Sequence, residues 1–158
     1  IAAGINYIGT DPCTATFEGL EHIKEEWSDK KRLCELYKVG SEEFWPDAQS
    51  IDLCFTSPPY YDWEKYSEEE TQSYKKYPEV QDWIDGFLWH TMDKCHYGLK
   101  PGGILAMNVA NTKRIKNFEE ETIRIAKEIH YKHIDTWYLQ LSSQEGKVKV
   151  EPIFIFQK

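Results

Sequence analysis

The sequence has no long apolar run and no excess of basic residues. Its longest purely apolar stretches, such as 153–156, are the length of a strand, far below the roughly 20 residues that a membrane-spanning helix needs. The 19 Lys and Arg residues are outnumbered by 27 Asp and Glu residues, so the formal net charge is −8. Because duplex phosphates are bound through clustered Lys and Arg, this balance argues against the segment alone being a strong duplex binder. We also expect no membrane association.

The chain also lacks paired cysteines. Its four cysteines are widely spaced and form no C-x-x-C pair; they are Cys13, Cys34, Cys54 and Cys95. Zinc sites need ligands at short spacing, so we expect no metal site. Isolated cysteines within apolar runs are typical of buried, reduced thiols, which indicates a cytoplasmic protein.

The length and composition fit one globular domain over residues 1–158, since 41% of the residues are hydrophobic. Strand-like apolar runs alternate with stretches of helical periodicity. Strands are predicted over 6–11, 33–39, 51–56, 104–109, 134–141 and 148–157, and helices over 14–26, 79–97 and 118–130. This alternation predicts an α/β fold with a doubly wound, mostly parallel sheet. The last two strands have no helix between them and are expected to pair antiparallel.

Two finer expectations concern individual elements. Residues 51–56 are nearly continuous in apolar residues, which is typical of a strand covered on both faces. The helix at 118–130 is expected to be capped by Asn117. Four residues of this helix share one face and are expected to point inward, namely Phe118, Thr122, Ile125 and Ile129.

The segment Thr56-Ser57-Pro58-Pro59-Tyr60 follows the predicted strand 51–56 directly. In open α/β sheets, ligands bind beyond the carboxyl ends of the strands. Two prolines stiffen the backbone and remove two N–H donors, so the nearby carbonyls are free acceptors with fixed directions. The segment therefore predicts a slot for a planar group with an exocyclic amine. Ser57 and the Pro58 carbonyl would accept the amine hydrogens, and Tyr60 would stack on the ring. The alternative is a proline-rich turn whose tyrosine packs on the domain.

On these residues the sequence resembles the S-adenosylmethionine-dependent methyltransferases that modify adenine N6 or cytosine N4 in DNA. Their signature is an acidic residue, Ser or Asn, then two prolines and an aromatic residue. The resemblance covers almost the whole chain in strand order. It implies a Rossmann-like class I methyltransferase fold, S-adenosylmethionine as cofactor and DNA as partner, with the target base flipped into the pocket. It also implies catalytic roles for Ser57, Pro58, Pro59 and Tyr60.

Two turns resemble the cofactor-binding turns of this family. Asp11 ends the first predicted strand and matches the acid that binds the cofactor ribose, together with Pro12. A carboxylate at a strand end can accept two hydrogen bonds from a vicinal diol. The alternative is that Asp11 caps the helix that follows. Gly40 and Ser41 match the turn whose acid contacts the adenine amine, with serine in place of that acid.

The aromatic segment after the motif is a further candidate for the substrate site. Trp63 and Tyr66 are expected either to line the base pocket or to form a lid, because loops at strand ends often do. The alternative is a surface hairpin with its aromatic side chains tucked under. Asn108 and Asn111 end the next strand; they either face the same crevice or are ordinary strand and turn residues.

The family's glycine-rich turn is missing from this sequence, which has nine glycines and no G-x-G. We expect the first strand and its glycine turn to lie before Ile1, with residues 1–4 ending the first helix. The domain would then be partial, and the segment alone would bind the cofactor weakly. No target-recognition region is evident either, and the sequence makes no prediction of oligomeric state.

Two other functions remain open at this stage. Similar Pro-Pro-Tyr slots occur in methyltransferases that act on RNA guanine or on glutamine side chains, since all of these substrates present a planar amine. A non-catalytic partner subunit that keeps the methyltransferase fold is the other alternative, and the missing glycine turn suits it.

Overall fold

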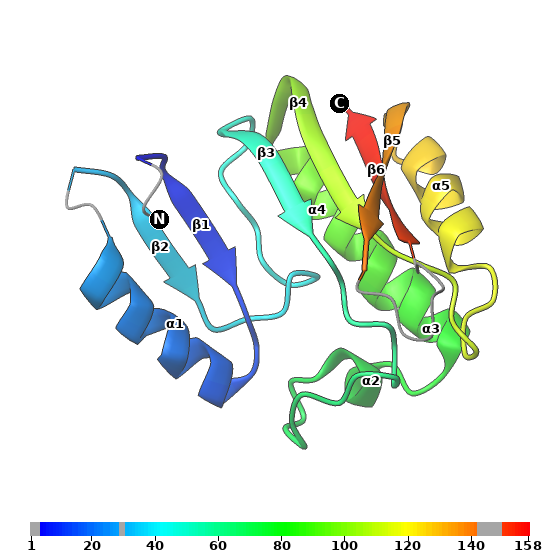
Figure 1. Ribbon diagram of the computed structural model, residues 1–158, viewed down its shortest axis with the longest axis horizontal. Helices are drawn as coiled ribbons and strands as arrows, with labels where there is room; N and C mark the ends of the chain where they lie inside the picture. The colour runs from blue at the N-terminus through cyan, green and yellow to red at the C-terminus, as the bar shows by residue number, and fades with distance from the viewer. Residues whose placement is uncertain (1–3, 29–30, 142–149) are drawn as a thin grey trace.

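The computed structural model describes residues 4–28, 31–141 and 150–158 and has an α/β fold (Figure 1). Its strands are β1 (Tyr7–Thr10), β2 (Cys34–Tyr37), β3 (Ile51–Thr56), β4 (Leu99–Asn108), β5 (Lys132–Gln140) and β6 (Val150–Gln157). Its helices are α1 (Thr14–Trp27), α2 (Ser73–Lys76), α3 (Val80–Trp83), the π-helical η1 (Ile84–Leu88), α4 (Trp89–Gly98) and α5 (Phe118–Glu128). Residues 1–3, 29–30 and 142–149 lie outside the described residues. They include most of the predicted helix end at 1–4, the whole link between the last two predicted strands and the start of the predicted strand 148–157.

The strands form two hydrogen-bonded groups. One group is the parallel pair β1–β2, and the other has the order β3-β4-β6-β5. In the larger group β3 and β4 are parallel, whereas β6 is antiparallel to both of its neighbours. The arrows of β1 and β2 run in the same direction as those of β3 and β4 (Figure 1). Five strands therefore share one direction and β6 opposes them, which confirms the predicted mostly parallel sheet with an antiparallel strand near the C-terminus.

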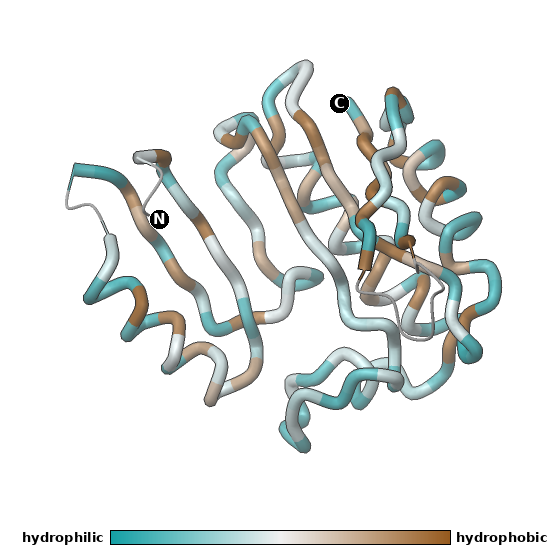
Figure 2. Tube along the Cα trace, viewed as in Figure 1, coloured by the Kyte–Doolittle hydropathy of each residue, from teal (hydrophilic) through white to brown (hydrophobic). Residues whose placement is uncertain are grey.

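Helices cover one face of the four-stranded group. The predicted helix 79–97 is continuous through α3, η1 and α4, and α5 lies beside it. Hydrophobic residues concentrate along the central strands and the inner sides of these helices (Figure 2). The four inward-facing residues predicted on α5 and its end are all buried, which confirms that prediction. The largest fully buried side chains include Trp83, Leu88, Met92, Leu105, Met107, Phe118 and Phe156.

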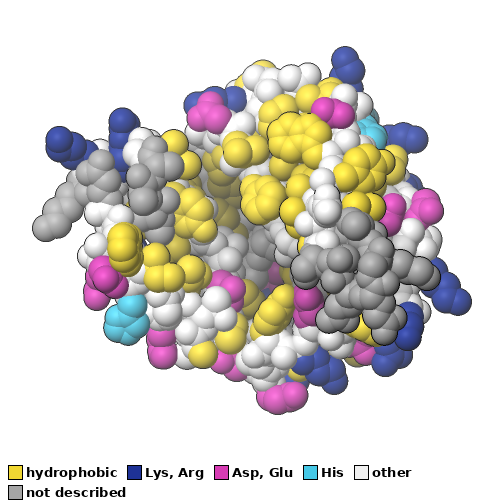
Figure 3. Space-filling model, in the orientation of Figure 1, with side chains coloured by type: hydrophobic (Ala, Val, Ile, Leu, Met, Phe, Trp, Pro, Cys, Tyr) yellow, Lys and Arg dark blue, Asp and Glu magenta, His cyan; other side chains and the backbone are white. Residues whose placement is uncertain are grey.

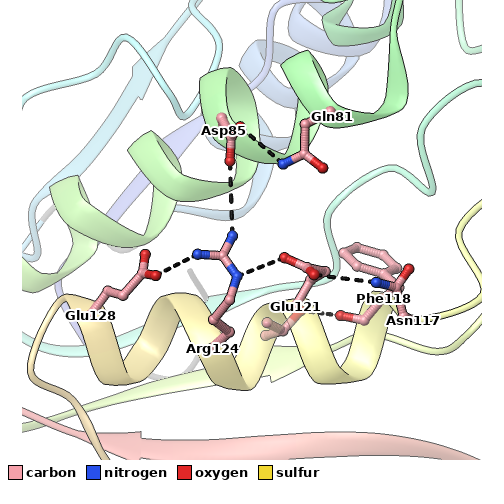
Figure 4. Close-up of polar contacts among 8 residues, drawn as sticks. Gln81, Asp85, Asn117, Phe118, Glu121, Arg124 and Glu128 are labelled. Carbon is pink, nitrogen blue, oxygen red and sulfur yellow. Dashed lines mark hydrogen bonds and ion pairs between the residues drawn. The ribbon is translucent and has the colours of Figure 1, made fainter.

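On the outer side of α5, ion pairs and hydrogen bonds connect it to the neighbouring helical stretch. Arg124 contacts Glu121 at 2.8 Å and Asp85 of η1 at 3.8 Å, as Figure 4 shows. Asn117 is the N-cap residue of α5 as predicted, but its side chain makes no capping hydrogen bond and instead donates to Glu121 at 3.2 Å. The capping acceptor comes from Asn111, whose Oδ1 accepts the Glu119 N–H at 3.0 Å, so the loop before α5 supplies the capping side chain.

The prediction that β3 is covered on both faces is also wrong. Its Cys54 side packs against the helical core, whereas Leu53 and Phe55, on the opposite side, are 59% and 66% exposed. The reason is that β3 is an edge strand and no described element covers that face. Hydrophobic side chains gather on this side of the molecule (Figure 3). Among the described residues, no helix has the length and apolar character needed to cross a membrane.

Candidate active site

Two cavities meet beside the segment that follows β3. A pocket of about 440 Å³ is lined by Ser57, Tyr60 and Trp63 together with residues of the loop after β4 and of β6. A larger groove of about 1400 Å³ runs between β1 and β3 and past the turn after β2. Ser57 lines both cavities. A group bound in the groove and a group bound in the pocket would therefore approach each other at Ser57.

The aromatic ring of Tyr60 forms one wall of the smaller pocket. It meets the ring of Phe118 edge-to-face, with centroids 5.7 Å apart. Its hydroxyl donates to Oε2 of Glu151 at 3.5 Å. Burial, then the negative charge of Glu151, raise the pKa of Tyr60 to about 12, so the phenol is neutral at physiological pH. The ring is thus fixed by contacts on its edge and hydroxyl while it lines the pocket.

The backbone turns sharply directly after Tyr60. Tyr61 has a φ of 57°, in the left-handed region that side chains rarely adopt. Its buried ring packs on Trp83, and its hydroxyl donates to the Pro78 carbonyl. The Trp63 N–H closes the turn by donating to the Tyr60 carbonyl at 3.1 Å. These contacts hold Tyr61 in its strained conformation and so direct Tyr60 and Trp63 into the same pocket.

The side chain of Ser57 is positioned by β4 and β6. Its hydroxyl donates to Oδ1 of Asn108 at 3.5 Å. Asn108 is buried, and its Nδ2 donates to the Pro152 carbonyl at 3.0 Å. This bond orients the amide so that its oxygen, Oδ1, faces Ser57. Because the hydroxyl hydrogen points to Asn108 and the oxygen has two lone pairs, Ser57 Oγ can accept a hydrogen from a bound group.

We expect Asn108→Leu to lower the free energy of unfolding by about 1–1.5 kcal/mol, because it removes a buried hydrogen bond to the Pro152 carbonyl, which keeps the Val109 N–H as its other donor at 3.3 Å. Urea denaturation measures this change. Asn117→Leu is the matched control: its amide is exposed, so the expected change is within about 0.5 kcal/mol. Equal effects of the two substitutions would contradict the assigned role of Asn108.

Asp11 lies in the groove at the end of β1. Its Oδ1 accepts the Cys13 N–H at 2.8 Å, and Glu69 accepts the Thr14 N–H at 3.1 Å, so both carboxylates cap the start of α1. The capping role considered from the sequence is therefore present, although Asp11 still lines the groove beside Pro12. Burial, partly offset by the Cys13 hydrogen bond, raises the pKa of Asp11 above its ordinary value of 3.8.

The turn after β2 brings a second carboxylate into the groove. Gly40 and Ser41 line the groove, and the Ser41 hydroxyl bonds to that of Thr91 at 2.9 Å. Glu42 is only 4% exposed, and its Oε1 accepts from Lys76 Nζ at 2.7 Å. Its Oε2 is buried with no hydrogen-bond partner among the described residues. The carboxylate lies against Gly40, where any side chain would collide with it.

Glu42 is the site residue that the sequence analysis missed. The expected acid was placed at position 41, where the chain has serine, and the adjacent Glu42-Glu43 pair was not considered. The two glutamates directly after Ser41 indicate such a residue, because an acid one position later in a turn can still place its carboxylate in the same groove. An unpartnered buried carboxylate oxygen is costly unless a ligand or water satisfies it.

The two aromatic candidates after the motif lie in different cavities. Trp63, which is 57% exposed, lines the smaller pocket with Ser57 and Tyr60. Tyr66, which is 63% exposed, lines the groove, and its hydroxyl donates to Glu64 at 2.7 Å. Their exposure does not fit a hairpin with its aromatic side chains tucked under. Of the two candidate asparagines, Asn108 ends β4 and lines neither cavity, whereas Asn111 lines the smaller pocket while its side chain also caps α5.

No protein-family model and no curated protein matches the chain. Solved structures do. A SAM-dependent methyltransferase from Methanosarcina mazei superposes with a TM-score of 0.64 over 99% of this chain and 84% of its own, at 11% identity. The chain has the Rossmann-like fold of such methyltransferases.

Two further structures share this methyltransferase fold. The N-methyltransferase NodS from Bradyrhizobium japonicum matches 96% of the chain and 72% of its own length, with a TM-score of 0.62 and 14% identity. A candidate DNA modification methylase from Thermus thermophilus matches 76% of the chain with a TM-score of 0.54 and 17% identity. The match spans 50% of the Thermus protein. At these identities the likeness concerns the fold, and confirms the fold class expected from the sequence.

Proposed function

We propose that the protein is an S-adenosylmethionine-dependent methyltransferase that modifies the exocyclic amino group of a DNA base, cytosine N4 or adenine N6. The observation that carries this proposal is the position of Ser57, which lines both the groove and the Tyr60 pocket. A methyl donor held in the groove and a planar amine held in the pocket would meet there. The methyltransferase fold and the Ser-Pro-Pro-Tyr segment support the same assignment.

The groove offers hydrogen-bond acceptors that suit a nucleoside cofactor. Asp11 stands at the end of β1, where a carboxylate can accept both hydroxyls of a ribose. The buried Oε2 of Glu42 is an acceptor without a partner among the described residues, and the adenine amine would satisfy it. When bound, S-adenosylmethionine supplies an electrophilic methyl group on a sulfonium centre.

The residues around the smaller pocket can activate an amine. The lone pair of an exocyclic amine is delocalised into the base and is a poor nucleophile. Acceptors at Ser57 Oγ and the Pro58 carbonyl favour a pyramidal nitrogen whose lone pair is freer, and Tyr60 holds the base plane. The nitrogen would then bond to the methyl carbon while the methyl–sulfur bond breaks and its electron pair stays on sulfur, which leaves S-adenosylhomocysteine. One N–H proton would leave to solvent afterwards, so no strong base is needed. Most of the acceleration comes from positioning and electrostatics.

The proposal also names DNA as the molecule that carries the target amine. DNA is favoured by the serine at position 57 and by the Thermus neighbour that is described as a candidate DNA modification methylase. A base within a duplex would have to be flipped out to reach Tyr60. The pocket is lined by Glu64 and Glu151 but also by Lys113, and the net charge is −8. This charge balance does not favour strong duplex binding by these 158 residues.

The substrate assignment is tested with labelled S-adenosylmethionine and the full-length protein. Duplex DNA, single-stranded DNA, RNA and glutamine-containing peptides are offered in parallel, with the Ser57→Ala variant as control. We expect label in DNA, and less of it with Ser57→Ala. Label only in RNA or peptide would refute the DNA assignment. Tight cofactor binding with no transfer to any substrate would favour a non-catalytic partner subunit.

We expect Glu42→Gln to weaken cofactor binding about tenfold, because hydrogen bonds to a charged acceptor contribute about 1.5–3 kcal/mol and the neutral amide retains only part of that. Isothermal titration calorimetry measures the affinity. Glu43→Gln is the matched control: Glu43 shares the Lys76 ion pair, at 2.9 Å, but is 53% exposed at its side chain. Equal losses of cofactor affinity in the two variants would mean that the loss comes from the shared ion pair with Lys76 and not from a contact of Glu42 with the cofactor.

A further inference from the structure

Two of the side chains that line the larger groove carry a buried polar atom with no hydrogen-bond partner among residues 4–28, 31–141 and 150–158. One of these atoms is Oε2 of Glu42, and the other is Nε2 of Gln72. Gln72 is 5% exposed and directly precedes α2, yet its side chain makes no capping hydrogen bond with that helix. A buried N–H without a partner is costly unless a bound group accepts it. The groove therefore presents one unused acceptor and one unused donor.

Hydrogen bonds on both sides of Gln72 fix its position in the chain. The Thr71 hydroxyl donates to the Pro12 carbonyl at 3.1 Å, in the turn after β1. The Ser73 hydroxyl accepts the indole N–H of Trp83 at 3.0 Å, within the core. Because both neighbours of Gln72 are anchored, its amide is held at the groove before any ligand binds. Such preorganisation lowers the ordering cost of binding.

The segment that contains Gln72 also contacts the surroundings of both carboxylates of the groove. Thr71 bonds to the residue that directly follows Asp11. The Lys76 N–H donates to the Gln72 carbonyl at 3.1 Å, so these two residues are one helical turn apart. Nζ of Lys76 in turn lies 2.7 Å from Oε1 of Glu42. In Figure 1, α2 lies on the side to which the arrows of β1 and β3 point. Gln72 therefore lies between the carboxylate proposed to bind the ribose and the carboxylate proposed to bind the adenine amine.

We infer that Gln72 is a specificity-determining residue of the cofactor site, whose Nε2 donates a hydrogen bond to a ring nitrogen beside the adenine amine. The inference rests on the proposed function, because it takes S-adenosylmethionine as the ligand of the groove. The amine of adenine is a donor, and the ring nitrogens on either side of it, N1 and N7, are acceptors. The carboxylate oxygen of Glu42 and the amide N–H of Gln72 match this pattern. A base that lacked the ring nitrogen would leave the buried N–H unpaired and would bind more weakly.

Gln72→Leu separates ligand recognition from a role in folding. The substitution removes an unpaired buried donor, so the melting temperature of the cofactor-free protein is expected to stay unchanged or to rise. Cofactor affinity is expected to fall about threefold to tenfold, because one hydrogen bond is lost. Gln72→Glu keeps the shape of the side chain but removes the donor, and should weaken binding at least as much. Gln81→Leu is the matched control: Gln81 is exposed on α3 and lines neither cavity, so affinity should stay unchanged.

Calorimetric titration of the full-length protein with S-adenosylhomocysteine and its 1-deaza and 7-deaza analogues tests the inference without requiring methyl transfer. The unmodified protein should bind one of the two analogues about threefold to tenfold more weakly than S-adenosylhomocysteine. Gln72→Leu should bind that analogue and S-adenosylhomocysteine equally.

The inference and the proposed cofactor site fail in different ways in this experiment. Unchanged affinity, or unchanged discrimination between the three ligands, in Gln72→Leu would overturn the inference and leave the cofactor site standing. A lowered melting temperature of the cofactor-free Gln72→Leu variant would also overturn it, because it would assign Gln72 a role in the fold. Failure of the unmodified protein to bind S-adenosylhomocysteine would contradict the cofactor site, and the inference with it.

Discussion

Tyr60→Ala is expected to reduce methyl transfer by the full-length protein about a hundredfold or more, while leaving cofactor affinity nearly unchanged. Stacking of a base on an aromatic ring contributes about 1–3 kcal/mol, and a misplaced reacting group costs about a hundredfold in rate. Tyr60 lines the smaller pocket but not the groove where the cofactor is proposed to bind. Single-turnover transfer and cofactor titration, performed on the same preparation, measure the two quantities.

Tyr60→Phe is the control for this prediction. It keeps the ring and its edge contact with Phe118, and removes only the hydroxyl that donates weakly to Glu151 at 3.5 Å. We expect its activity to remain near that of the unmodified protein. If Tyr60→Ala lost cofactor binding as severely as transfer, the tyrosine would serve to hold the loop folded, and the stacking role would be wrong.

Asp11→Ala is expected to weaken cofactor binding about tenfold to a hundredfold, because it removes the charged group that we propose accepts the two ribose hydroxyls. The same substitution also removes the cap on Cys13, so its effect combines two roles. Asp11→Asn separates them, since its amide oxygen can still accept the Cys13 N–H while the charge is lost. Cofactor titration of both variants, with thermal unfolding in parallel, distinguishes ligand binding from helix capping.

The pH dependence of cofactor binding follows from the same carboxylate. Burial raises the pKa of Asp11 above 3.8, and donated hydroxyls favour the ionised form. Affinity should therefore fall as the pH falls through this raised pKa. The free energy of unfolding of the cofactor-free protein should instead rise as the pH falls, because a raised pKa of a carboxyl group in the folded state means that protonation favours folding. Asp11→Asn should remove this component of both dependences, and an unchanged affinity profile in that variant would contradict the assignment.

The order and type of the main elements follow from local patterns. Residues 14–26 and 118–130 have helical periodicity, and the structure has helices at Thr14–Trp27 and Phe118–Glu128. Strand 51–56 was predicted with its observed bounds, but its exposed face was not. The apolar run indicates that Leu53 and Phe55 favour burial. It does not show which other element covers them. Similarly, whether Asn117 or Asn111 caps α5 depends on the path of the preceding loop.

The candidate site was predictable where it depends on strand ends. Ser57 and Tyr60 follow β3, and Asp11 follows β1, so their meeting at one edge of the sheet follows from parallel topology. Glu42 was missed because the turn places its carboxylate one residue later than the expected acid. The division of Trp63 and Tyr66 between two cavities arises from the left-handed turn at Tyr61, which sequence periodicity does not encode.

The central claim is methylation of an exocyclic amine, and the position of the transferred methyl group tests it most directly. The full-length protein is incubated with DNA and S-adenosylmethionine bearing a deuterated methyl group, and the DNA is digested to nucleosides for mass spectrometry. We predict a deuterated methyl group on cytosine N4 or adenine N6. A deuterated methyl group on a ring carbon, such as cytosine C5, would contradict the proposed roles of Ser57, Pro58 and Tyr60.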